Sequence, residues 1–283
     1  MSIHSLSRPS RFSHLRALAA IARKDWLHFW RYPLNVVALV TQPLVWLAPV
    51  FFMGRAFSVD GQALGFAAYS GTSDYMSFIL LGTVLGNFVN AVFWGMGYAL
   101  KNDMDGGTLE ANWILPVPRP LMLAGRTIIS LATTALTSVA MLLLAGWIFG
   151  FHPTGSAWQT ILIALPMLIG LYGFGFAFAA LVLIMRDANT LVDVSSFLVQ
   201  GFSGTDFPVT VLPKWLLPVS MLIPLTYGLD AARARLLGTT PLLPVRVEVL
   251  VIVAFMFVMT WLGMVVFRGL ERRVRQRGTL GTH

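Results

Sequence analysis

The chain has 283 residues, of which 57% are hydrophobic and 11% are charged, and its mean hydropathy is +0.74. Because about a quarter of the residues are charged in a typical soluble domain, this composition excludes a soluble globular protein and predicts an integral membrane protein. The net charge of +8 does not indicate nucleic-acid binding, since the basic residues stand at the ends of apolar runs. The absence of cysteine excludes disulfides and thiolate metal sites.

Residues 1–33 are predicted to form a cytoplasmic tail and an amphipathic helix at the membrane surface. Apolar residues recur there at helical spacing, with Trp26 facing lipid and with Arg16, Arg23 and Lys24 facing anionic headgroups. The same basic and aromatic residues interrupt the apolar core that a cleavable signal sequence needs, so we expect the N-terminus to be retained. An ordinary basic juxtamembrane segment is the alternative.

The apolar runs predict an all-α integral membrane fold with six transmembrane helices. A run of about 20 residues crosses the roughly 30 Å hydrocarbon core of a bilayer. The runs occupy residues 34–57, 75–100, 127–151, 158–185, 191–203 and 247–267. Together they give a transmembrane domain over residues 34–267, which a basic tail follows at residues 268–283.

The distribution of Lys and Arg predicts the orientation of these spans. Fifteen of the 20 basic residues lie before the first run, between the second and third, between the fourth and fifth, or after the last. The positive-inside rule therefore places both termini in the cytoplasm. An even number of spans agrees with this, whereas a seventh span would put the C-terminal arginines outside.

Polar residues within two runs are candidates for lining a translocation path. Asn87 and Asn90 lie on nearly the same face of the second run, and Thr134 and Thr137 belong to a polar stripe on the third. Hydrogen bonding between helices without any role in transport is the alternative. Glycines at GxxxG spacing in the second run predict that its helix packs closely against a neighbour.

A polar, turn-rich segment at residues 101–126 separates the second and third runs. Gly107 breaks a preceding helix, Thr108 can cap a following one, and prolines between residues 116 and 120 end it before the chain re-enters the membrane. We expect a short surface helix that a partner protein contacts. A solvated loop is the alternative.

The fifth run has only thirteen residues, which reach about 20 Å as a helix and fall short of the hydrocarbon core. The following segment, residues 204–228, is apolar, but prolines divide it, so it cannot be one helix. Short re-entrant helices in the outer leaflet, shielded by protein, fit both facts. The dividing prolines are Pro208, Pro213, Pro218 and Pro224.

Asp206 stands at the start of this re-entrant segment. An ionised carboxylate costs free energy in lipid unless it faces water or a partner. We therefore expect Asp206 to gate the exit or to select the substrate. Its alternative role is that of a helix N-cap.

Several kinds of catalytic and energy-coupling chemistry are missing from the sequence. It contains no GxxxxGK[ST] phosphate loop and no HExxH or GxSxG motif. It also lacks the paired intramembrane acids that carry protons in ion-coupled carriers. The chain is therefore expected to be no enzyme and to hold no cofactor or metal, so its energy must come from elsewhere.

Three segments carry a resemblance to a known family, and they are ARKDWLHFWRYPLNVVALVTQPLVW, GGTLEANWILPVPRPLMLAGR and FSGTDFPVTVLPKWLLPVSMLIPLTYGLDAAR. They resemble segments of the permease subunits of type-2 ATP-binding-cassette (ABC) exporters, most closely the drug-resistance (daunorubicin-resistance-like) branch. The first is similar to the family's connecting helix and first span, the second to its cytoplasmic coupling segment, and the third to the signature SGxxFPxxxLPxWL…PLTY between the last two spans. The family commonly has apolar residues between SG and FP, where this chain has Thr205 and Asp206.

The resemblance implies a permease of a bacterial inner membrane, paired with a second permease, expected to be an identical copy, and docked to a separate ABC ATPase that binds ATP and Mg. The residues that would contact the ATPase are Gly107, Thr108, Leu109 and Glu110. The matching outer re-entrant gate comprises Phe207, Pro208, Leu212, Pro213 and Trp215, with Asp206 beside them.

An amphipathic substrate, either drug-like or lipid, is the expected cargo of such an exporter. A lipid-linked polysaccharide or another glycoconjugate is the alternative within the class. An ion-coupled secondary carrier and a membrane-embedded enzyme are the alternatives from other classes.

Overall fold

The computed structural model describes residues 11–58, 63–97, 119–151, 155–184 and 188–277, and every regular element in these ranges is helical. The all-α fold is thus confirmed for this part of the chain. The longer helices are α1 (Arg11–Arg31), α2 (Pro33–Ala56), α4 (Tyr75–Asn90), α7 (Arg119–Phe149), α8 (Ala157–Ile184), α9 (Ala188–Ser203), α11 (Pro224–Leu237) and α12 (Val245–Arg277). The shorter elements are α3 (Leu64–Ser70), the π-helix η1 (Ala91–Gly97), the 3-10 turn η2 (Val209–Val211) and α10 (Leu217–Met221).

Five of these helical stretches are long and apolar enough to cross a membrane. They are Pro33–Ala56, Tyr75–Gly95, Met122–Phe149, Ala157–Val182 and Val245–Gly269. The remaining predicted span corresponds to α9, whose 16 residues extend only about 24 Å. The structure therefore supports an integral membrane protein with five apolar spans, and the sixth span stays a prediction.

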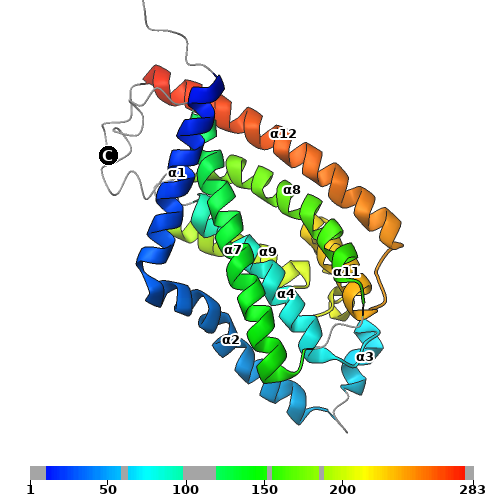
Figure 1. The fold of residues 1–283 in the computed structure, drawn as a ribbon. Coiled ribbons are helices and arrows are strands. Elements are labelled where there is room, and N and C mark those ends of the chain that lie inside the picture. Colours follow the sequence, from blue (N-terminus) through cyan, green and yellow to red (C-terminus); the bar gives the residue numbers. More distant parts are fainter. Residues whose placement is uncertain (1–10, 59–62, 98–118, 152–154, 185–187, 278–283) are drawn as a thin grey trace, which may run out of the picture.

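The arrangement of the helices shows which way the chain runs between α8 and α12, where α9 lies (Figure 1). The start of α7 and the end of α12 lie at one end of the bundle beside α1, whereas α3 and the start of α12 lie at the other. The end of α8 lies on the same side as the end of α12. The chain between α8 and α12 therefore passes from one end of the bundle to the other, and α9 makes the first part of this passage.

Prolines divide the segment after α9, as predicted. Gly204 follows α9 with a φ of 79°, and a β-carbon there would press on the side chain of Val209, so glycine suits the turn. Pro208 precedes η2, Pro218 lies in the first turn of α10, and Pro224 opens α11. Proline is favoured at these helix starts because its missing N–H would have no intrahelical partner there.

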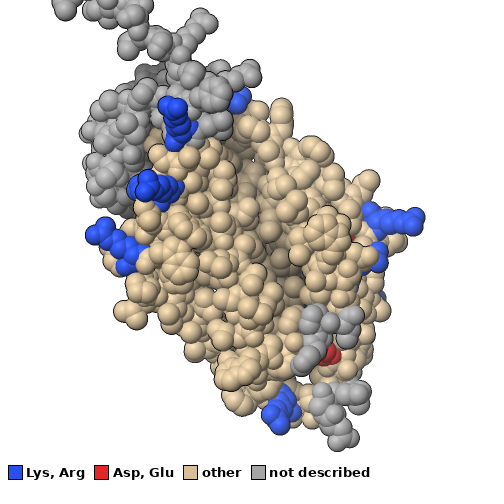
Figure 2. Space-filling view, in the orientation of Figure 1, with Lys and Arg blue, Asp and Glu red and all other residues tan. Residues whose placement is uncertain are grey.

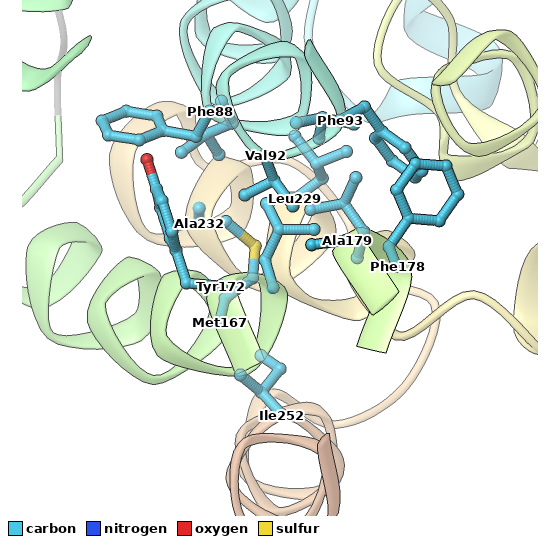
Figure 3. Packing of buried hydrophobic residues seen from close by; sticks show 14 of the residues in the cluster. Phe88, Val92, Phe93, Met167, Tyr172, Phe178, Ala179, Leu229, Ala232 and Ile252 are labelled. Atoms are coloured by element: carbon cyan, nitrogen blue, oxygen red, sulfur yellow. The ribbon is translucent and has the colours of Figure 1, made fainter. Parts of the chain in front are cut away.

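The main hydrophobic core lies between α4, η1, α8 and α11, and Ile252 of α12 joins it (Figure 3). Phe93 of η1 packs edge-on against Phe178 of α8, with 4.7 Å between the ring centroids. Met167 of α8 and Leu229 of α11 are also fully buried in this cluster. Because α4 is covered by several neighbours, it is the central helix of the bundle.

Glycines allow two especially close backbone contacts. A β-carbon at Gly173 of α8 would lie 2.7 Å from the backbone of Thr260 in α12. A β-carbon at Gly82 of α4 would overlap the carbonyl group of Thr205. Small residues permit such approaches in membrane proteins. The glycine-bearing face of the second run is thus closely packed, but its nearest backbone neighbour is the 204–205 turn and not another helix.

Candidate translocation site

A cavity of about 1110 Å³ lies between α2, α4, η1, α7 and α9. The candidate path residues Asn87, Asn90, Thr134 and Thr137 all belong to its wall, and so does Asp206. The structure thus brings together residues that are up to 119 positions apart in the sequence. The aromatic residues of the wall are Trp46, Tyr75, Trp94 and Phe197.

The asparagines of α4 connect this wall to two neighbouring helices. Asn87 donates through Nδ2 to the sulfur of Met141 in α7, with 3.6 Å between the atoms. Gln200 of α9 donates through Nε2 to Oδ1 of Asn90 at 2.9 Å. The asparagines therefore make the interhelical hydrogen bonds of the alternative interpretation and also face the cavity.

The π-helix η1 extends this wall beyond the end of α4. A π-helix has a wider turn than an α-helix and often occurs at functional sites. Trp94 and Gly95 of η1 line the cavity, whereas Val92 and Phe93 are fully buried in the core. The change of helix type thus divides η1 between the core and the cavity.

The threonines of α7 contribute little exposed polarity to the cavity. The hydroxyl group of Thr137 donates to the carbonyl oxygens of Thr133 and Thr134, at 3.0 and 3.1 Å. A hydroxyl group satisfied within its own helix can face an apolar space at small cost. The side-chain amides, the hydroxyl group of Tyr75 and the carboxylate of Asp206 are therefore wall groups that can bind a polar part of a substrate.

Arg233 of α11 holds the turn on which Asp206 stands. Its side chain is only 3% exposed, and its guanidinium group donates to the carbonyl oxygens of Gly204 at 2.5 Å, Thr205 at 2.6 Å and Phe78 at 3.2 Å. The same group lies 3.5 Å from the centre of the Phe78 ring, a favourable cation–π distance. Arg233 therefore joins the 204–205 turn to α4 and α11.

Arg233 is one of the five basic residues that the positive-inside rule leaves on the outer side of the membrane. A signal was nevertheless present, since Arg233 and Arg235 are two positions apart and so point in directions about 200° apart on a helix. At most one of them can face solvent on a packed helix. Arg235 is the exposed one, and the neighbours of Arg233, such as Ala231 and Ala232, are buried.

The side chain of Asp206 is exposed at the cavity. It forms no hydrogen bond or ion pair with another described residue, and the residue at the N-cap of η2 is Pro208. Asp206 lies outside the five apolar spans. Partial burial raises the pKa of Asp206 above its ordinary value, and the positive charge of nearby Arg233 opposes this increase.

The other predicted gate residues lie along the turns after Asp206 and outside the cavity wall. Pro208 is buried, and the indole of Trp215 is 76% exposed. The structure thus separates Asp206, which faces the cavity, from the rest of the proposed gate. These separated residues are Phe207, Pro208, Leu212, Pro213 and Trp215.

Helix α1 packs against the first turns of α7 and keeps its basic residues exposed. A β-carbon at Gly125 of α7 would lie 3.2 Å from the side chain of Ile21. The exposed residues of α1 include Arg16, Arg23, Lys24 and Trp26. Figure 2 shows Lys and Arg at the rim of the molecule around a large uncharged face, an arrangement that suits a membrane protein.

The predicted ATPase contacts Gly107, Thr108, Leu109 and Glu110 lie outside the described residues. The structure describes the end of the coupling segment, because α7 begins at Arg119, before the apolar run at 127–151. Residues 119–126 therefore form the first two turns of α7. A partner bound to the coupling segment would act directly on this helix.

Comparison with known proteins identifies the family. The family model for ABC-2 type transporters matches residues 16–237, which is more than half of the chain and runs from within α1 to the end of α11. A search of curated proteins found no match. Membrane domains of this family are the transmembrane components of ABC transporters, and the family implies an ABC ATPase as partner. The chain belongs to the ABC-2 type transporter family and is a multi-pass membrane permease subunit of an ABC transporter.

Proposed function

We propose that this permease exports an amphipathic substrate, such as a drug-like molecule or a lipid, through the cavity between α2, α4, η1, α7 and α9. It acts as a pair of identical permeases in a bacterial inner membrane, with both termini in the cytoplasm and with an ABC ATPase that binds ATP and Mg. The observation that carries the proposal is that polar residues of α4, α7 and the 205–206 turn meet in one cavity of about 1110 Å³.

The composition of the wall supports an amphipathic substrate. Binding sites for small molecules are mostly apolar clefts with a few placed polar groups, and they commonly measure about 300–1,000 Å³. This cavity is slightly larger than that range and combines aromatic residues with asparagine amides and one carboxylate. A molecule with both an apolar body and a polar group matches such a wall best.

The second permease is proposed to cover the side of the cavity formed by α2. Trp46 lines the cavity and is 74% exposed, and Val45 and Phe52 of the same helix are also largely exposed. Within the described residues, α2 contacts only α1, α4 and α7 extensively. A second copy placed against this open side would complete a path shared by two chains.

The proposed mechanism is mechanical. ATP-dependent closure of the ATPase moves the coupling segment, and with it the start of α7, which contacts α1, α2 and α4. Since α2, α4 and α7 all contribute to the cavity wall, this movement changes the shape of the cavity. Packed helices usually switch between discrete arrangements, and the two arrangements here would open the cavity to opposite sides.

Cysteine labelling tests the proposed path, because the chain contains no cysteine of its own. Thr134→Cys places a thiol in the cavity wall, and Val139→Cys places one on the exposed face of the same helix. A bulky maleimide should block ATP-driven transport into sealed vesicles for Thr134→Cys and leave it intact for Val139→Cys. Complete labelling at residue 134 without loss of transport would exclude this cavity as the path.

Copurification tests the energy source. The permease should copurify with an ABC ATPase, and the double variant Leu109→Ala/Glu110→Ala should stay inserted while ATP hydrolysis no longer supports transport. Undiminished transport by the well-expressed double variant would contradict the coupling assignment. Transport by the purified permease alone, driven by an ion gradient, would instead support a secondary carrier.

A further inference from the structure

The charged group in the described part of the cavity wall is negative. Among the described residues that line the cavity, Asp206 is the one with a charged side chain, and no Lys or Arg belongs to the wall. Its carboxylate is exposed to the cavity and forms no hydrogen bond or ion pair with another described residue. A carboxylate in this position attracts cations and repels anions.

The backbone that leads to Asp206 is held in a fixed place. Gly204 makes a tight turn with a φ of 79°, Arg233 binds the carbonyl groups of residues 204 and 205, and the hydroxyl groups of Ser203 and Thr205 are 2.9 Å apart. The backbone just before Asp206 is thus anchored on both sides of the turn. Preorganised groups bind a ligand better because little conformational entropy is lost on binding.

The positive charge of Arg233 offsets only part of the negative charge that Asp206 presents to a ligand in the cavity, because Arg233 also interacts with Asp230. The guanidinium group is buried behind the 204–205 backbone and its N–H groups point at three carbonyl oxygens. It is not part of the cavity wall, whereas Asp206 is. A ligand therefore meets the carboxylate first.

The rest of the wall suits the apolar body of an organic cation. Trp46 and Trp94 present large aromatic surfaces, and Tyr75 lies close enough to Asp206 to interact with its charge. Aromatic faces attract cations by about 0.5–2 kcal/mol. A carboxylate beside aromatic rings is therefore a better match for an aromatic or bulky cation than for a small hydrated ion, which would have to lose its water.

We propose that the cavity selects amphipathic organic cations, with Asp206 binding the cationic group and the aromatic residues binding the apolar body. This inference rests on the proposed export function and names its substrate class. It depends on a residue pair, Thr205 and Asp206, that departs from the apolar pair expected from the family resemblance.

Equilibrium binding to the purified permease tests this selectivity without requiring transport. The probes are tetraphenylphosphonium, the neutral triphenylphosphine oxide and the anion tetraphenylborate, which share phenyl groups but differ in charge. The wild-type chain should prefer tetraphenylphosphonium. Asp206→Asn should weaken tetraphenylphosphonium binding about tenfold, the effect of roughly 1.4 kcal/mol, while binding of the neutral probe stays within about twofold.

The matched control is Asp193→Asn, which removes an exposed carboxylate from α9 outside the cavity wall. It should leave binding of all three probes unchanged. Equal loss in both variants, unchanged tetraphenylphosphonium binding in Asp206→Asn, or no preference in the wild type would each overturn the inference. Thermal unfolding of each variant shows that the compared proteins are folded.

Transport measurements separate this inference from the proposed function. If Asp206→Asn loses cation binding but neither it nor the wild type transports any probe with the ATPase present, the export proposal fails while the selectivity stands. If both proteins transport all three probes equally well, the selectivity fails while the export proposal stands.

Discussion

Replacing Arg233 by methionine should destabilise the permease, because Arg233 is the donor for three backbone carbonyl groups. The substitution keeps most of the side-chain volume and removes the hydrogen bonds to Phe78, Gly204 and Thr205. A buried acceptor without a partner costs about 1–3 kcal/mol. Removing the buried charge also relieves its own desolvation cost, so we use the lower figure of about 1 kcal/mol for each carbonyl group. The net loss for the three groups is therefore about 3 kcal/mol.

Thermal unfolding of the detergent-solubilised permease measures this loss. Since 1 kcal/mol corresponds to about 2–4 °C for proteins of 150–250 residues, the midpoint should fall by roughly 6–12 °C. Arg233→Lys should lie between wild type and Arg233→Met, because an ammonium group keeps the charge but cannot reproduce the planar fork of donors. The difference in unfolding midpoint between Arg233→Lys and Arg233→Met separates the contribution of the positive charge from that of the donor geometry.

Arg235→Met is the matched control, since it removes the exposed arginine two positions further along α11. Its midpoint should stay within about 2 °C of the wild type, in line with the small effect of most surface substitutions. The reasoning is refuted if Arg233→Met is as stable as Arg235→Met. That result would mean that the three carbonyl groups find other donors when the guanidinium group is absent.

Three further predictions follow from packing, topology and charge. Gly82→Ala should lower the unfolding midpoint because its β-carbon overlaps the Thr205 carbonyl group, whereas Gly201→Ala, with no atom within 4 Å, should not. In intact cells an impermeant thiol reagent should label Lys214→Cys and not Lys24→Cys, and labelling of both would contradict the predicted topology. Cation preference in the binding assay should disappear as the pH falls through the pKa of Asp206, and because that pKa is raised it should disappear at a higher pH than for an ordinary aspartate. Arg233 and Tyr75 are the titratable groups that interact with Asp206. An equal pH response in Asp206→Asn would refute this prediction.

Hydropathy and proline positions were enough to predict the class of fold and the division of the segment after α9. They were not enough to predict where helices end. The apolar run at 127–151 begins after Arg126, but α7 begins at Arg119, because hydropathy reports where lipid contact ends and a helix can continue into water. The π-helix at the end of α4 was also missed, since its residues are as apolar as those of an α-helix.

The candidate site was predictable residue by residue but not as a whole. Asn87, Asn90, Thr134 and Thr137 could be identified because a polar side chain is unusual in an apolar run. Their meeting with Asp206 depends on the path of the chain after α9, which the 204–205 turn and Arg233 determine. Those contacts join residues up to 155 positions apart, and no local pattern in the sequence specifies them.

The packing of the bundle indicates which walls of the cavity move when the ATPase closes. Helices α8, α11 and α12 contact one another extensively, and glycines bring α8 and α12 so close that a β-carbon at Gly173 would strike the Thr260 backbone. Helices α1, α2 and α7 form a second group, and α7 follows the coupling segment directly. Arg233 anchors the Asp206 turn to the first group. Closure is therefore expected to move α2 and α7 past a carboxylate that stays in place, so the affinity for a cation changes because Trp46 of α2 moves relative to Asp206.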